Sequence, residues 1–146
     1  MGYRVFGWCG KLKTASLSSN LSTIPFGTFM YSALESFEVA DGVQVIDEYA
    51  IEASKVIIPE SVCEIKEYGV WASEIHGRSG TEAERYAISR NIKFVTDEVF
   101  HVVFKNDDGT ILSEQDVPYG KDAKEPEIPK KESDNYNRYE FEGWEG

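Results

Sequence analysis

The sequence has little cysteine, few basic residues and no long apolar run. Cys9 and Cys63 are the only two cysteines among 146 residues, which is too few for a disulfide framework. The 15 Lys and Arg residues are outnumbered by 26 Asp and Glu, which weighs against a nucleic-acid partner because phosphate binding calls for basic patches. No apolar run is long enough to cross a bilayer, so we expect no membrane insertion. The start, MGYRVFGWCGK, lacks the regions of a secretory signal peptide.

Histidine is also rare, and this limits the chemistry that the chain can perform. His76 and His101 are the only two, and neither has a His or Cys at metal-ligand spacing. No third group is apparent that would orient Cys63 and His76 as a nucleophile pair. Residues 106–110, NDDGT, lack the alternating acids and the distal Glu of an EF-hand calcium loop. We therefore predict no catalysis, no metal and no cofactor.

One apolar pattern recurs along the first half of the chain. Residues 37–54, FEVADGVQVIDEYAIEAS, align with residues 56–73, VIIPESVCEIKEYGVWAS, at a constant offset of 19 residues. The same frame extends back, at an offset of 22 residues, into residues 12–29, LKTASLSSNLSTIPFGTF. A fixed apolar pattern with this period is typical of a solenoid, in which stacking buries the apolar face that one unit cannot bury alone.

Each repeat contains a strand-like stretch, at residues 12–17, 34–39 and 55–58. Side chains alternate between the two faces of a strand, which predicts an inner and an outer set. The residues expected to point inward are Leu12, Leu17, Leu34, Val39 and Ile58. The residues expected on the outer face are Ser16, Glu38 and Ile57, with Lys13 and Glu35 near them. Cys9 is expected to point into the stack and Cys63 to be exposed.

The repeat pattern ends after residue 77, and a helix is predicted next. Residues 81–84, TEAE, have the form of a capping box, with Thr at the N-cap and Glu three residues later. Ala83, Tyr86 and Ala87 recur at helical spacing and form one apolar face. Asn91 lies where the end of a helix needs a positive φ. A last strand is predicted at residues 92–95, and the helix is expected to cover the open end of the repeats.

The composition changes at Glu98, and the chain from Glu98 on contains 13 acids and 6 bases. Residues 98–120 predict a β-hairpin, because alternating apolar residues precede the turn NDDG and Ile111 starts the return strand. Residues 138–146, RYEFEGWEG, predict a last strand with Tyr139, Phe141 and Trp144 as its apolar members. The predicted domains are therefore residues 1–97 and residues 98–146.

Three stretches resemble known families. Residues 29–73 resemble the BspA-type leucine-rich repeat, whose pattern is roughly AF-x-x-C-x-x-L-x-x-V-x-IP-x-x-V-x-x-I. Residues 78–95, RSGTEAERYAISRNIKFV, resemble the C-terminal cap of that family, with Gly80 displaced and Asn91 in place of its Gly. The V-x-F strand, the DGT turn, the V-x-YG element and the F-x-GW ending after residue 98 resemble the internalin-type B-repeat. The insertion ESDNYN before Arg138 and the stop at Gly146 depart from that pattern.

These resemblances imply a mixed, mostly β fold, in which a short leucine-rich-repeat solenoid with a capping helix precedes a small β-grasp-like domain. BspA-like chains are associated with adhesion, and B-repeats act mostly as stalks or spacers. We therefore expect a non-catalytic interaction module of a secreted or cell-surface bacterial protein, with a protein or glycan partner. Two alternatives stay open, namely a structural or receptor-binding component of a phage particle and an accessory domain of a larger secreted enzyme.

The outer face of the repeat sheet is the expected place for a partner, because solenoids present extended faces. The candidate contact residues are Ser16, Glu35, Glu38, Lys55 and Ile57, together with Trp71, which is expected to be exposed. An ordinary solvated strand surface would give the same pattern, and that interpretation also stays open. Phe6 already occupies a repeat position, so we expect earlier repeats before it and end-to-end self-association through an uncovered first repeat.

Overall fold

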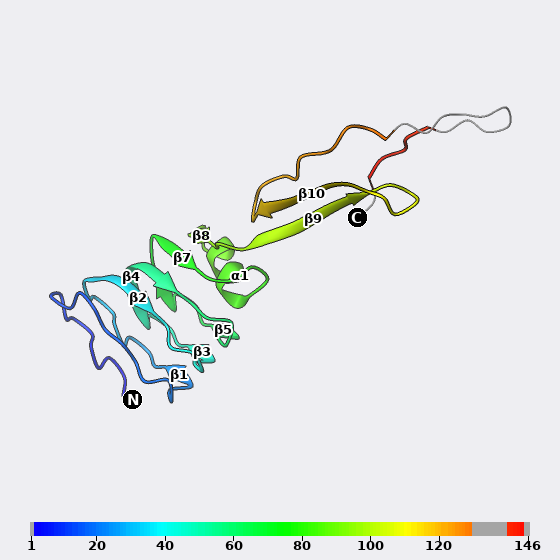
Figure 1. Ribbon diagram of the computed structural model, residues 1–146. Coiled ribbons are helices and arrows are strands. Elements are labelled where there is room, and N and C mark those ends of the chain that lie inside the picture. Colours follow the sequence, from blue (N-terminus) through cyan, green and yellow to red (C-terminus); the bar gives the residue numbers. More distant parts are fainter. Residues whose placement is uncertain (1, 130–139, 145–146) are drawn as a thin grey trace, which may run out of the picture. The chain divides into compact units, whose positions relative to one another are not determined.

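The computed structural model describes residues 2–129 and 140–144, and the chain divides into two compact units, Met1–Glu98 and Val99–Gly146 (Figure 1). The described residues are mostly β, with one short helix. In the first unit, a parallel sheet contains β2 (Leu34–Glu38), β4 (Ile51–Ile57), β7 (Glu74–His76) and β8 (Lys93–Val95), in that order, with β6 (Val70–Trp71) beside the start of β4. We call it the repeat sheet. A second parallel sheet contains β1 (Thr23–Ile24), β3 (Val45–Ile46) and β5 (Glu64–Ile65).

The sequence period explains the strand pairing. Lys55 of β4 is the register partner of Glu74 of β7, and Glu74 is the partner of Lys93 of β8, so each step is the 19-residue offset of the repeats. Ile51 and Val70 pair at the same offset. Equivalent residues of successive repeats therefore lie side by side, which turns a pattern along the chain into rows across the sheet.

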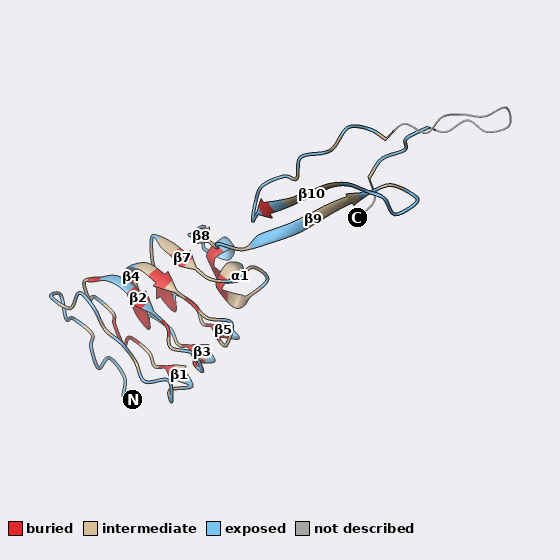
Figure 2. Cartoon of the chain, viewed as in Figure 1, coloured by how far each residue is buried: buried red, intermediate tan, exposed pale blue. Residues whose placement is uncertain are grey.

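The apolar positions of the pattern form the core of this unit. The predicted inward residues Leu34, Val39 and Ile58 are buried, and Leu12 and Leu17 are partly buried against the same cluster. Fully buried rows come from equivalent positions in successive repeats: Ile24 with Ile46, Phe29 with Ile51, Val43 with Val62, and Phe37 with Val56 and Ile75. Figure 2 marks buried residues on the strands and on the helix of this unit. Burial of these rows is the main favourable term for folding the unit.

Two expectations for the first repeat are wrong. Residues 12–17 form no strand, and their backbone meets β2 through a long bond of 3.3 Å from the Glu35 N–H to the Lys13 carbonyl. Cys9 is exposed instead of pointing into the stack. It follows a turn in which Trp8 has a positive φ of 65°, so strand alternation does not apply there. Cys63 is exposed as predicted, and both thiols are free.

Helix α1 (Glu82–Ser89) covers the last repeat with its predicted face, Ala83, Tyr86 and Ala87, all buried. The hydrogen bonds predicted for the capping box are wrong. Thr81 occupies the N-cap, but its hydroxyl donates to the Arg78 carbonyl (2.6 Å), and the Glu84 carboxylate accepts from the Gly80 N–H. The physical reason is the turn at Gly80, whose positive φ of 75° brings Thr81 back onto residue 78. Asn91 has the predicted positive φ, 54°.

The hydroxyl of Tyr86 closes a sheet edge. It donates to the Val70 carbonyl at 3.0 Å and accepts from the Val70 N–H at 3.2 Å. In a parallel ladder, the N–H and C=O of one residue point to the same neighbour, and those of Val70 face away from β4. Burial raises the pKa of Tyr86, so the hydroxyl keeps its proton and can donate. One side chain of α1 thus replaces the next strand.

The second unit contains the predicted hairpin. Strands β9 (Val99–Lys105) and β10 (Ile111–Pro118) pair antiparallel, and the Asn106 N–H donates to the Thr110 carbonyl at 2.8 Å across the turn. The predicted last strand is wrong for residues 140–144, because the ring of Trp144 packs on Phe104 (4.9 Å between centroids) and Gly143 turns the chain with a φ of 138°. Tyr139 lies outside the described residues.

Candidate functional site

Three of the predicted contact residues lie together on the outer face of the repeat sheet. Glu38 and Ile57 are register partners, and Ile57 is also the partner of His76 on β7. Lys55 lies two residues before Ile57 on the same strand, beside Glu74. Glu38 is exposed, whereas Lys55 and Ile57 are half-buried. These neighbouring side chains mix acidic, basic and apolar groups, so this part of the face can make polar and apolar contacts at once.

Ion pairs fix the next part of this face. Glu74 accepts hydrogen bonds from Lys93 (2.8 Å) and from His76 (2.9 Å). The bond from Lys93, followed by the bond from His76, lowers the pKa of Glu74 from 4.5 to about 2. The carboxylate is therefore charged throughout the neutral and mildly acidic range, and it holds its two partners in place.

The other two residues predicted on this face lie nearer the first repeat. Glu35 forms an ion pair with Lys13 at 2.8 Å, and that lysine lowers the pKa of the Glu35 carboxyl. Ser16 is exposed in the segment that forms no strand. Ser16 therefore does not join the aligned rows of the repeat sheet, whereas Glu35 stays on β2, between the register pairs Leu34–Ala53 and Ser36–Lys55.

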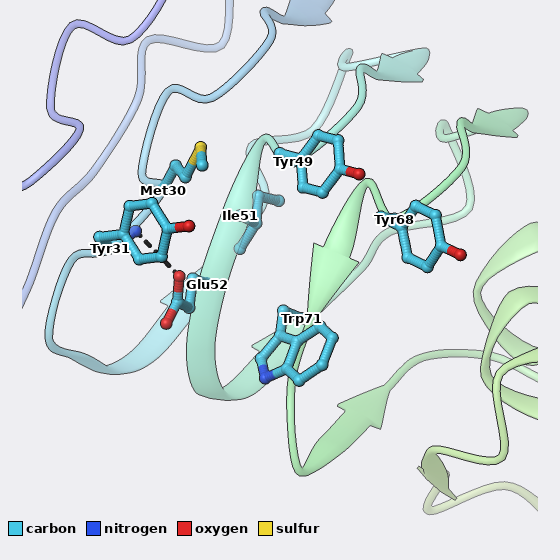
Figure 3. Close-up of a pocket in the computed structure, with 7 residues that line it drawn as sticks. All are labelled: Met30, Tyr31, Tyr49, Ile51, Glu52, Tyr68 and Trp71. Atoms are coloured by element: carbon cyan, nitrogen blue, oxygen red, sulfur yellow. Dashed lines mark hydrogen bonds between the residues drawn. The ribbon is translucent and has the colours of Figure 1, made fainter.

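Trp71 belongs to a second surface, which we call the aromatic groove (Figure 3). Its volume is about 370 Å³, and its lining residues are Met30, Tyr31, Tyr49, Ile51, Glu52, Tyr68 and Trp71. Ile51 is buried at the bottom of the groove, whereas Trp71 is 70% exposed. Glu52 and Trp71 are register partners on β4 and β6, so their side chains start from neighbouring positions of the groove. A concave surface of aromatic rings with few polar groups is typical of binding sites.

The backbone of the repeats dictates where the groove tyrosines stand. Tyr49 and Tyr68 both have a φ of 54°, and Gly27, at the equivalent position of the preceding repeat, has a φ of 65°. The left-handed conformation costs a residue with a side chain roughly 1–2 kcal/mol, whereas glycine adopts it freely. Tyr49 and Tyr68 therefore hold strained positions, with their rings stacked 5.6 Å apart and about half exposed. Such strain often accompanies functional sites.

Charge in the groove is uneven. Oε2 of Glu52 accepts a hydrogen bond from the Tyr31 N–H at 2.8 Å, which fixes the carboxylate in the groove (Figure 3). None of the ion pairs between described residues includes Glu52. At one end, the guanidinium of Arg90 lies 4.5 Å from the centre of the Tyr68 ring. The groove thus combines a fixed negative charge and electron-rich rings with one guanidinium at its Tyr68 end.

Sequence reasoning found Trp71 and missed the rest of the groove. The signal was present, because Tyr49 and Tyr68 recur at the 19-residue offset and Glu52 and Trp71 follow three residues after them. Nothing in the sequence, however, shows that these tyrosines adopt a left-handed backbone that turns their rings outward.

A family comparison now identifies the class of the chain. The model of the BspA-type leucine-rich repeat region, in six copies, matches residues 1–76. The chain belongs to the BspA-type leucine-rich repeat family, which is a non-catalytic interaction family whose repeats generally mediate protein binding and typically occur on surface or secreted proteins. No curated protein and no solved structure matches the chain.

Two further findings concern only the part of the chain that the structure describes. None of its helices has the length and apolar character needed to cross a membrane. Within the same residues, no three His, Cys, Asp or Glu side chains gather into a group that could hold a metal ion.

Proposed function

We propose that the chain is a non-catalytic interaction module of a secreted or cell-surface bacterial protein, and that it binds a protein or glycan partner through its repeats. The observation that carries this proposal is the alignment of outward side chains across the repeat sheet. Glu38, Ile57 and His76 form one row, and they come from three successive repeats. A surface built from several repeats can be extended or altered one row at a time, which suits recognition of large partners.

We further propose that residues 1–97 form a short solenoid capped by α1, and that residues 98–146 form a separate β-grasp-like B-repeat domain. The parallel register of β4, β7 and β8 and the edge closed by Tyr86 support the first part. The β9–β10 hairpin, with its V-x-F strand and DGT turn, supports the second. In this arrangement the repeats recognise the partner, and the second domain acts as a spacer.

A binding screen tests the proposal. The full chain is immobilised and exposed to a panel of matrix proteins, glycans and bacterial wall material, beside the variants Glu38→Lys and Ile57→Asp. The expected result is a saturable hit that both variants weaken about tenfold or more. A reversed charge in the interface would repel the partner, and a new charge buried there without a partner would lower the binding free energy.

Glu64→Lys is the matched control, because Glu64 is an exposed carboxylate on β5, in the other sheet. It makes the same charge change without touching the repeat sheet, so it is expected to bind as the parent chain does. A hit that all three variants retain would contradict binding through the repeat sheet. No hit in the whole panel would contradict the interaction function for these partner classes.

A further inference from the structure

We propose that the aromatic groove binds an arginine side chain of a partner protein, with the guanidinium stacked on the Trp71 indole and hydrogen-bonded to the Glu52 carboxylate. This inference rests on the proposed interaction function and assigns one class of contact to one place. Among the predicted contact residues, only Trp71 pointed to this surface.

The seat for the guanidinium is the pair Glu52 and Trp71. They are register partners on adjacent parallel strands, and neighbouring strands lie about 4.8 Å apart. The carboxylate is fixed by its bond from the Tyr31 N–H, which occupies Oε2, and it has a second oxygen to offer. The indole is 70% exposed. In Figure 3, Trp71 closes one side of the groove and Tyr31, Tyr49 and Tyr68 surround the other sides.

Two arginines of this chain already place their guanidinium groups over aromatic rings of the repeats. Arg90 lies over Tyr68 at 4.5 Å, and Arg4 lies over Phe26 at 5.2 Å. Tyr49 and Tyr68 are only 5.6 Å apart, which leaves no space for a guanidinium between them, so Arg90 covers the outer face of the stack. Trp71 offers an exposed ring of the same kind, and indole binds cations more strongly than a phenol or a phenyl ring.

Charge complementarity favours a cation over a neutral ligand. The lining of the groove includes the Glu52 carboxylate and no basic residue, and the guanidinium of Arg90, over the Tyr68 ring at one end, is paired with Glu67 at 3.8 Å. Residues 1–97 carry 13 acids and 9 bases, so the surrounding field also attracts positive charge. Arginine fits better than lysine, because its planar guanidinium can stack on an indole while its edge donates to a carboxylate.

The experiment uses the full chain and a five-residue peptide with one arginine between glycine and serine residues. A twin peptide carries citrulline, which keeps the shape of arginine without its charge, and methyl glucoside serves as a neutral sugar probe. Binding is followed through the indole N–H signal of Trp71 in nitrogen-15 correlation spectra. The Glu52→Gln variant removes the charge and keeps an oxygen for the Tyr31 N–H, and Glu64→Gln is the matched control.

The arginine peptide is expected to shift the Trp71 signal saturably. The citrulline twin is expected to bind the parent chain about tenfold more weakly than the arginine peptide does, and the Glu52→Gln variant is expected to bind the arginine peptide about tenfold more weakly than the parent chain does. A tenfold loss of affinity corresponds to the low end of the range for a hydrogen bond to a charged group. Glu64→Gln is expected to change nothing. Equal binding of arginine and citrulline, a Trp71 shift with methyl glucoside alone, or no shift at all would overturn the proposal.

The two proposals fail separately. A protein hit in the binding screen that Glu52→Gln and Trp71→Ala both retain, with no arginine shift, would overturn the arginine site and leave the interaction function standing. An arginine shift without any hit in the screen would support the site and count against the function proposed for the whole chain.

Discussion

The Tyr86→Phe substitution removes one oxygen atom and tests how the last repeat is closed. The phenylalanine ring fills the same space, and the parent side chain is only 5% exposed, so packing is preserved. What is lost is the pair of hydrogen bonds to Val70, at 3.0 Å and 3.2 Å. The N–H and C=O of Val70 then remain buried without a partner. Each unsatisfied buried group costs about 1–3 kcal/mol. Local adjustment of the backbone offsets part of the cost of leaving both groups of Val70 without a partner.

We therefore expect the free energy of unfolding to fall by about 2 kcal/mol. For a unit of this size, the melting temperature would fall by about 10 °C. Urea denaturation followed by circular dichroism, and by tryptophan fluorescence, measures the change. Tyr49→Phe is the control, because the side chain of Tyr49 is 44% exposed, and it is expected to stay within about 0.5 kcal/mol of the parent. If Tyr86→Phe were equally harmless, the edge of β6 would not depend on this hydroxyl.

Two other predictions concern the ion pairs and the core. The pKa of Glu74 is lowered from 4.5 to about 2, so its ion pairs stabilise the folded state above pH 4.5, and this contribution is lost as the pH falls from 4.5 through about 2. Lys93→Met is expected to raise that pKa in a carboxyl titration by NMR, and Lys66→Met, whose lysine pairs with Asp47, is expected to leave it unchanged. Phe37→Ala is expected to lower the free energy of unfolding by about 4 kcal/mol in urea, because Phe37 is 1% exposed and packs on Phe29 at 4.7 Å. A loss below about 1 kcal/mol would contradict its place in the core.

The parts of the fold that depend on period were predictable from the sequence. Val39 and Ile58 repeat at 19 residues, and both are buried because a constant offset places equivalent residues in one row. The mostly β character, the helix with its buried Tyr86 and the β9–β10 hairpin followed from local patterns of the same kind. Periodicity reports which side chains share an environment, and burial of apolar area then decides which environment it is.

Other features depend on backbone conformations that a pattern of residue types does not specify. Cys9 follows a left-handed residue, so alternation fails and the thiol faces solvent. Thr81 satisfies the letters of a capping box, yet Gly80 bends the chain so that its hydroxyl meets Arg78. Residues 140–144 alternate like a strand, but the ring contacts of Trp144 decide their course. The same limit explains why Tyr49 and Tyr68 were not identified as exposed.

The left-handed position of each repeat has a consequence for how such chains can be altered. Arg4, Gly27, Tyr49 and Tyr68 all hold this conformation, with φ between 54° and 65°, so one backbone accepts a cation, no side chain, or a phenol. When glycine replaces a larger residue at this position, the contacts of the side chain are lost, but the backbone strain is relieved, because glycine adopts the left-handed conformation freely. Different kinds of side chain can therefore be exchanged at these positions while the backbone that carries them keeps its shape.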